Sequence, residues 1–256
     1  MLKNYISYHS ILGMLSKRYK LLIDNKGFIK NSKEICLTNS IDIEEYKDQY
    51  QKISLIYQNK EQFDFIRSNY NVTSFWKSTQ IISYFNPNFF KLEGMTYREI
   101  RETKNKYNKC IRIENEIKDI NEVIEFIQSW KNNRGSNKYG WQEHSGYDMN
   151  FFQQYYEIEK DNLYHTFIYD QNNNLLGYSI VEKNNVNNQL NYIIRKAHWN
   201  MRNICLYLDY ITFEKIYNDH KEFYINWGCS SGTLLKYKSK FPIHNLETKY
   251  FIKIKS

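Results

Sequence analysis

Three lysines near the C-terminus follow a turn rich in small residues and could together hold an anion. Residues 225–242 read INWGCSSGTLLKYKSKFP, in which a strand-like start breaks at Gly228 and leads to Lys236, Lys238 and Lys240. Alternate side chains of an extended segment point the same way, so the three lysines would form one positive stripe that suits a phosphate group. An exposed strand edge kept soluble by its lysines explains the pattern equally well.

Two other basic groups have a spacing that suits anion binding. Arg98 and Arg101 lie three positions apart, close enough on a helix to reach one anion, although neighbouring glutamates could neutralise them instead. Arg134 lies in a glycine-containing loop that ends at Trp141, so it combines a charge with an aromatic plane on which a nucleobase could stack. An ordinary surface loop has the same composition.

A proton acceptor is harder to identify from the sequence. His198 lies beside Trp199 and follows two basic residues, which makes it a candidate for catalysis. His165 is inside a strand-like segment, where a structural histidine is the more common case. Cys229 follows the glycine of the C-terminal turn, but no partner for a nucleophilic thiol can be identified.

Composition limits the class of protein. The chain has 256 residues, enough for one large domain or two modest ones, and carries a net charge of +8. Its many lysines, asparagines, isoleucines and tyrosines also suggest an AT-rich genome, so the charge is weak evidence for a polyanionic partner. The four cysteines lack the spacing of a zinc site and indicate reduced thiols. We find no leader or membrane-length apolar run and expect a soluble, cytoplasmic protein.

Hydrophobic patterns predict alternating helices and strands. We expect helices at 41–50, 60–69, 96–110, 120–131, 148–160 and 203–217, and strands at 52–57, 78–84, 110–113, 164–169, 175–181, 189–195, 222–227 and 248–254. The segment DQNNN at 170–174 predicts a tight turn between two of the strands. Residues 203–217 read as an amphipathic helix that packs on the sheet by one face.

Three segments resemble the C-terminal catalytic domains of phosphatidylglycerol lysyltransferases and their soluble relatives, which are tandem GNAT domains akin to the Fem peptidyltransferases. The first is YREIRETKNKYNK at 97–109, in which Arg101 and Asn105 match the family's Arg-then-Asn helix. The second is the helix of Trp130 followed by the basic loop ending at Trp141. The third is INWGCSSGTLLKYKSKF, and the resemblance covers about residues 52–254.

The resemblance implies an α+β protein of tandem GNAT-like (acyl-CoA N-acyltransferase) fold, with mixed, mostly antiparallel sheets flanked by helices. It divides the chain into an N-terminal GNAT-like half at 1–95, a connecting helix at 96–110 and a catalytic domain at 111–256. Whether the segment to about residue 40, which does not match the family, completes the first half is left open.

The implied activity is transfer of an aminoacyl group from aminoacyl-tRNA, or of an acyl group from a thioester such as acyl-CoA, to an amine or hydroxyl acceptor. The glycine turn that cradles CoA in acetyltransferases is missing, since residues 195–203 read RKAHWNMRN. We therefore expect a donor held by side chains, with no tightly bound cofactor and no metal.

Site residues follow from these patterns and the resemblance. We expect His198 and Lys238 to be catalytic. The expected donor-binding residues are Arg98, Arg101, Asn105, Arg134, Trp141, Asn226, Gly228, Ser230, Lys236 and Lys240. The acceptor, whether lipid, peptide, small amine or nucleic acid, is left open. Two alternatives also stay open: a GNAT-fold enzyme that modifies nucleic acid, and a non-catalytic GNAT-like module that binds RNA or anionic lipid.

Overall fold

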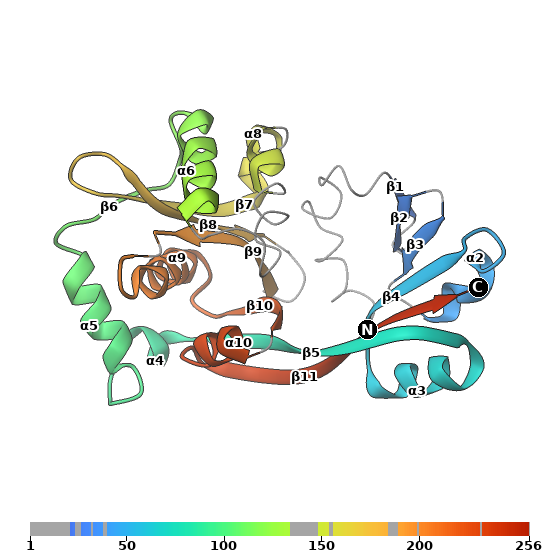
Figure 1. Cartoon of the computed structure of the whole chain (residues 1–256). Helices are drawn as coiled ribbons and strands as arrows, with labels where there is room; N and C mark the ends of the chain where they lie inside the picture. The colour runs from blue at the N-terminus through green and yellow to red at the C-terminus, as the bar shows by residue number, and fades with distance from the viewer. Residues whose placement is uncertain are drawn as a thin grey trace. The chain divides into compact units, whose positions relative to one another are not determined.

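The chain packs as two compact units whose residues are not consecutive. A computed structural model describes residues 21–23, 27–31, 33–37, 40–133, 148–153, 156–183, 189–198, 200–230 and 232–255 (Figure 1). The first unit groups residues 1–82, 227–239 and 243–256, and the second groups 83–226 and 240–242. These units differ from the consecutive segments predicted at 1–95, 96–110 and 111–256, because the C-terminal strand pairs with a strand of the first unit.

Strands of the first unit form a mixed sheet. In sheet order they are β1 (Leu21–Ile23), β2 (Gly27–Asn31), β3 (Glu34–Leu37), β4 (Lys52–Gln58), β11 (Ile243–Lys255) and β5 (Asn71–Phe85). The β1, β2 and β3 strands are antiparallel neighbours, β3 and β4 are parallel, and β11 is antiparallel to β4. The predicted strands at 52–57, 78–84 and 248–254 are confirmed, and two of them extend well beyond the predicted residues.

The core of the first unit is apolar. It lies between the sheet and the helices α2 (Ile43–Tyr46), which follows the short turn η2 (Ser40–Asp42), and α3 (Lys60–Asn69). Asn59 forms a capping box with Gln62, which fixes where α3 begins. Phe63 and Ile66 of α3 are buried, whereas Phe65 is exposed. Phe63 and Ile66 lie three positions apart on one face of the helix, and Phe65 lies off that face.

The second unit contains the predicted hairpin. Its strands in sheet order are β10 (Phe223–Ser230), β9 (Gln189–Ala197), β8 (Leu175–Glu182), β7 (Leu163–Tyr169) and β6 (Arg112–Glu114). All neighbours are antiparallel except β9 and β10, which are parallel. In the turn, Asp170 Oδ1 accepts hydrogen bonds from the backbone N–H of Asn172 and Asn174, and Asn173 takes a φ of 63°. The hairpin prediction is confirmed.

Helices cover both faces of the second unit's sheet. On one side lie α6 (Ile120–Asn133), a helical stretch at 148–153 and α8 (Tyr156–Glu159), which continues into η3 (Lys160–Asn162); on the other lies α9 (Ile204–His220) (Figure 1). The helix α5 (Arg98–Tyr107) packs beside α9, and the short α4 (Pro87–Phe90) precedes it. Each of the predicted helices at 96–110 and 120–131 is confirmed.

The helix α9 is buried nearly all round. Ten of its residues are buried, among them the consecutive run from Leu206 to Phe213. The prediction of a one-sided amphipathic helix is therefore wrong, because the sheet, α5 and the aromatic cluster around Phe85 and Phe89 contact α9 from different sides.

Two facts about the described residues bear on the type of protein. None of their helices has the length and hydropathy needed to span a lipid bilayer. All four cysteines, Cys36, Cys110, Cys205 and Cys229, are free thiols.

Candidate active site

The candidate site lies in the second unit, where the parallel strands β9 and β10 stop pairing. Their register pairs are Gln189 with Tyr224, Leu190 with Ile225, and Asn191 with Asn226. Beyond Asn191, β9 continues to Ala197 with β8 as its registered partner. Where a strand loses a neighbour, its backbone N–H and C=O groups on that side become available for other partners. The divergence is therefore the place where β9 leaves its parallel neighbour and keeps β8 as its registered partner.

A β-bulge follows directly on the last shared pair. Tyr192 is registered with Val181 and Ile194 with Ile180, so Ile193 is an extra residue on β9. Side chains three positions apart on a regular strand point to opposite faces, but a bulge re-aims them. As a result Tyr192 and Arg195 point to the same side, toward α9.

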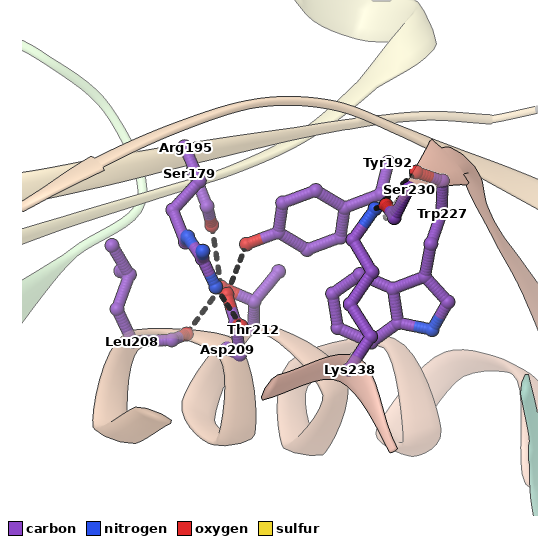
Figure 2. Close-up of polar contacts among 9 residues, drawn as sticks. All are labelled: Ser179, Tyr192, Arg195, Leu208, Asp209, Thr212, Trp227, Ser230 and Lys238. Atoms are coloured by element: carbon purple, nitrogen blue, oxygen red, sulfur yellow. Dashed lines mark hydrogen bonds and ion pairs between the residues drawn. The ribbon is translucent and has the colours of Figure 1, made fainter. Parts of the chain in front are cut away.

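Asp209 of α9 holds these two side chains (Figure 2). The Tyr192 hydroxyl donates to Asp209 Oδ1 at 2.5 Å, and the Arg195 guanidinium pairs with Oδ2. The Asp209 side chain is fully buried, and burial together with its charge raises the pKa of Tyr192 well above the ordinary value. The phenol therefore stays protonated. We conclude that this cluster holds the bulge in place and does not itself move protons.

A second hydrogen-bonded pair joins the same strand layer to α9. Ser179 Oγ of β8 and Thr212 Oγ1 lie 2.6 Å apart, and Thr212 donates to the carbonyl of Leu208 at 2.7 Å (Figure 2). Both hydroxyl groups are buried. The contact between β8 and α9 thus uses directional bonds in addition to apolar packing, which fixes the register of the helix on the sheet.

The opposite face of β9 carries another buried ion pair. Lys196 pairs with Asp148, and the Tyr178 hydroxyl donates to Asp148 Oδ2 at 3.4 Å. Lys196 Nζ lies 4.7 Å from the centre of the Trp130 ring, and Trp130 Nε1 donates to the Ala197 carbonyl at 3.0 Å. The C-terminal part of β9 is therefore fixed by polar groups on both faces.

Asn191 provides a buried acceptor at the point of divergence. Only 4% of the residue is exposed, and its Nδ2 donates to Glu182 Oε2 at 3.0 Å. Its Oδ1 has no hydrogen-bond partner among the described residues. A buried amide oxygen without a donor is costly, so a ligand N–H or O–H group placed there would stabilise the protein.

A carboxylate lies beside the N-terminus of α9. The N-cap residue Asn203 has a φ of 63° and makes no side-chain cap; its Nδ2 donates to Glu99 Oε1 at 3.2 Å. Lys240 Nζ donates to the same oxygen at 2.7 Å. A helix N-terminus favours anions such as a pyrophosphate, but here a protein carboxylate already lies next to it.

The predicted lysine stripe does not form. Residues Gly232–Lys238 are a helix, α10, so the prediction of an extended segment is wrong; the sequence TLLKYK contains good helix formers. Lys236 is exposed, whereas Lys238 is buried and donates to the Trp227 carbonyl and to Ser230 Oγ, both at 2.7 Å (Figure 2). Lys238 thus anchors α10 to β10 within the first unit.

Other residues of the C-terminal motif have structural roles as well. Gly228 takes a φ of 69° inside β10, a conformation that favours glycine. Asn226 is buried and is the β10 partner of Asn191, which places it at the divergence. Burial raises the pKa of Cys229 to about 12, so this thiol stays protonated.

The predicted residues of α5 mostly serve the helix and its neighbours. Arg101 donates to the carbonyls of Leu92 and Gly94 and so holds a turn. Arg98 forms an exposed ion pair with Glu102 at 2.6 Å, and Asn105 is exposed. For Arg98, therefore, the alternative interpretation holds: a neighbouring glutamate, Glu102, neutralises its charge.

The predicted catalytic histidine lies at the end of β9. His198 is half-buried, its backbone N–H donates to the Leu176 carbonyl at 2.8 Å, and its ring packs edge-on against Phe126. His165 lies 3.3 Å from the Tyr156 hydroxyl, and burial, aided by nearby lysines, lowers its pKa to about 4. Two predicted residues, Arg134 and Trp141, lie outside the described residues.

Sequence reasoning missed the residues that shape the divergence. Asn191, Tyr192 and Asp209 were not predicted as site residues. One signal was present: Asp209 stands in the otherwise apolar run ICLYLDYITF, where a charged residue needs a buried partner. The bulge that brings Tyr192 and Arg195 to one face leaves no comparable mark in the sequence.

Comparison with known proteins supplies a fold. No family model matches the sequence, and no curated protein gives a significant match. Among solved structures, L-PGS from Bacillus licheniformis matches with a TM-score of 0.60 and 12% identity, over 94% of this chain and 85% of that one. The C-terminal domain of a putative lysylphosphatidylglycerol synthetase from Agrobacterium fabrum gives a TM-score of 0.63 and 9% identity, over 98% and 90%.

A third solved structure carries the superfamily name. A tandem GNAT protein from the clavulanic acid biosynthesis pathway matches with a TM-score of 0.54 and 8% identity, over 89% of this chain and 77% of that one. Identities this low establish the fold alone, and they confirm the α+β prediction. The chain has a GNAT-like fold, as the lysylphosphatidylglycerol synthetase domain and the tandem GNAT protein do.

Proposed function

We propose that the protein is an acyltransferase that moves an aminoacyl group from aminoacyl-tRNA to an amine or hydroxyl acceptor. One observation carries the proposal: in a GNAT-like fold, β9 and β10 part at Asn191, where a buried acceptor oxygen has no partner among the described residues. Amino groups are the ligands that such an oxygen accepts from. The name of a neighbour in structure, lysylphosphatidylglycerol synthetase, points to an aminoacyl product for that protein.

The reaction needs positioning and charge stabilisation more than a strong base. The acceptor nitrogen or oxygen attacks the carbonyl carbon of the aminoacyl ester, and the negative charge that develops on the carbonyl oxygen needs hydrogen-bond donors. The bond to the ribose oxygen then breaks, and that oxygen takes up the proton lost by the acceptor. Two buried ion pairs hold the end of β9 still, so a substrate that contacts this strand would be kept in a fixed position.

The environment of α9 supports tRNA over CoA as the donor. CoA-dependent relatives hold a pyrophosphate at a helix N-terminus through backbone N–H groups. In this chain Glu99 lies beside that end of α9, bonded to Asn203 and Lys240. The Glu99–Lys240 ion pair already takes up this position, so a pyrophosphate would have to displace it, whereas an ester donor bound through its nucleotide and amino groups does not need this position.

The residues near the divergence would have different roles in the transfer. Asn191 Oδ1 accepts a hydrogen bond from the amino group of the aminoacyl moiety and so orients the ester. Tyr192, Arg195 and Asp209 hold the bulge. His198, at the end of β9, remains the candidate for proton transfer, since the low pKa of His165 and its contact with Tyr156 suit a structural role.

The test is a donor-consumption assay on the purified protein. We expect loss of aminoacyl-tRNA, and no loss of acyl-CoA, in the presence of a panel of lipids, peptides, small amines and RNA. Asn191→Leu should slow the transfer about tenfold, the value of one hydrogen bond, because it removes the acceptor oxygen. Glu182→Gln, which keeps an acceptor for the Asn191 amide, is the matched control and should stay within a few-fold of the wild type.

Three outcomes would count against the proposal. Consumption of acyl-CoA with any acceptor would overturn the choice of donor. Equal rates for Asn191→Leu and the wild type would remove the divergence as the site. Tight RNA binding without turnover against the whole acceptor panel would favour a non-catalytic module.

A further inference from the structure

The first unit contains a polar cavity that the transfer reaction does not use. Its volume is about 910 Å³, and its wall includes Lys47, Tyr50, Lys52 and Lys255. These residues come from the segment that joins α2 to β4 and from the end of β11. A volume of this size is within the range of small-molecule sites in proteins.

Two of the lysines lie side by side on neighbouring strands of the sheet. Lys52 of β4 and Lys255 of β11 are direct register partners, and both are exposed. Like charges directly opposite each other on antiparallel strands destabilise the pair by roughly 0.2–1 kcal/mol. An anion placed between the two ammonium groups would turn this repulsion into attraction, which is the usual reason for paired lysines at a phosphate site.

The rest of the wall suits the other half of a nucleotide. Tyr50 lines the cavity with a partly buried ring that packs on the apolar core and lies 6.4 Å from the ring of the buried Tyr46, and a base can stack on the part of the ring that stays exposed. Gln49 and Gln51, on either side of Tyr50, bring amide groups that can both donate and accept hydrogen bonds. Base edges need such groups.

The charges and the lack of aliphatic side chains exclude other common ligands. Lys47 adds a third ammonium group, balanced by an ion pair with Glu44 at 2.5 Å, and Asp48 is the acid among the lining residues. Among the described residues that line the cavity none is aliphatic, so these residues offer no surface for an acyl chain. A polar, phosphate-bearing ligand with an aromatic base fits these features, whereas a lipid does not.

We propose that this cavity binds a nucleoside phosphate, either free or at the single-stranded end of an RNA, with the phosphate between Lys52 and Lys255 and the base on Tyr50. The site belongs to the first unit and does not rest on the proposed transfer. The proposal is tested by a binding measurement, and its outcome does not depend on whether the protein consumes a donor.

The experiment titrates the full chain at low salt with four probes. Adenosine monophosphate and inorganic phosphate are measured by calorimetry, and a fluorescein-labelled oligoadenylate and phosphatidylglycerol vesicles by anisotropy and co-sedimentation. We expect binding of the two nucleotide probes. The double variant Lys52→Gln, Lys255→Gln should weaken oligoadenylate binding at least tenfold and reduce the slope of log K against log salt by about 0.7, the value for one phosphate contact of a single strand.

Two further variants separate the base from the phosphate. Tyr50→Leu should weaken both nucleotide probes several-fold through lost stacking. Lys60→Gln, an exposed lysine of the same unit that does not line the cavity, should leave binding unchanged. Because the Lys52 and Lys255 charges repel each other, the double variant should unfold at no lower temperature than the wild type. Equal unfolding temperatures would then exclude misfolding as the cause of a binding loss.

The overturning results are equally specific. Absence of nucleotide binding at millimolar concentration would reject the site. Binding that survives the double lysine variant would place the nucleotide elsewhere. Inorganic phosphate binding as tightly as adenosine monophosphate, or vesicles binding in preference to oligoadenylate, would reject the base contact with Tyr50.

Discussion

The two compact units differ in the kinds of side chain that they bury. The core of the first unit is an apolar cluster of mainly isoleucine, leucine and aromatic side chains from its strands and from α2 and α3. The second unit places a buried ion pair on each face of β9: Arg195 with Asp209, and Lys196 with Asp148. Burying an ion costs several kcal/mol unless excellent geometry offsets it, so apolar packing alone would have been the simpler solution.

The difference indicates where the protein needs precision. Apolar packing holds an element in place but tolerates small shifts, whereas a hydrogen-bonded ion pair also fixes direction. The two ion pairs of the second unit hold the strand that contains the bulge and the Asn191 oxygen, for which the described part of the chain supplies no donor. The first unit also buries polar groups, Lys238 among them, but its main core cluster is apolar and its cavity is lined by charged and polar side chains, which suits binding more than catalysis.

The largest expected effect comes from removing the central carboxylate of the second unit. Asp209→Ala takes away the group that both Tyr192 and Arg195 contact, and should lower the free energy of unfolding by about 3–5 kcal/mol. Urea denaturation followed by circular dichroism measures this. The control is Asp64→Ala in the first unit, whose carboxylate forms an exposed pair with Lys60 and should matter by less than about 1 kcal/mol. Equal losses would show that the buried pair contributes no more than a surface pair.

The next effect concerns the lysine that the sequence placed in the active site. Lys238→Met keeps the aliphatic stem but removes the ammonium group that donates to the Trp227 carbonyl and Ser230 Oγ. Leaving buried acceptors without this donor should cost about 2–3 kcal/mol in a denaturation experiment. Lys236→Met, two positions away and exposed, should cost no more than about 0.5 kcal/mol. If instead Lys238→Met keeps full stability but stops donor consumption, the sequence prediction of a catalytic lysine is right.

A smaller effect depends on pH. The pKa of His165 is about 4 in the folded protein, mainly because of burial, against an ordinary value of 6.5. Between these values the unfolded state binds more protons than the folded state, so stability is full above pH 6.5 and falls as the pH drops toward 4. We expect a loss of about 1–2 kcal/mol after allowing for solvent screening.

Substitution of the histidine tests the cause of this loss. His165→Gln should flatten the stability profile between pH 6.5 and 4, as measured by denaturation midpoints at several pH values. An unchanged slope in the His165 variant would mean that another group titrates.

The sequence predicted elements better than it predicted the site. Alternation and turn chemistry identified the hairpin around Asp170, because these features depend on residues close in the chain. The burial of α9 on nearly all sides depends on elements far away in sequence, so its own pattern wrongly predicted a helix with one buried face. The GNAT-like fold itself was predicted from element order and a few motifs.

The site was predicted only in part because its geometry depends on register. Asn226 was expected to bind the donor, and it does lie at the divergence, whereas its partner Asn191 was overlooked. No local pattern shows where two strands stop pairing or where a bulge inserts Ile193. Likewise, nothing in the spacing of the lysines showed that Gly232–Lys238 would coil and turn Lys238 inward.

The smallest effect separates a structural arginine from a donor-binding one. Arg101 donates to the carbonyls of Leu92 and Gly94, both in a turn with positive φ, so Arg101→Met should destabilise the second unit by about 1 kcal/mol. Arg98→Met, which removes an exposed pair with Glu102, should have almost no effect. Neither change should alter aminoacyl-tRNA consumption, because in this structure both guanidinium groups bind protein oxygens. A loss of donor consumption in Arg101→Met at unchanged stability would move the donor site to α5, as the family motif predicts, and would leave the β9 divergence with a purely structural role.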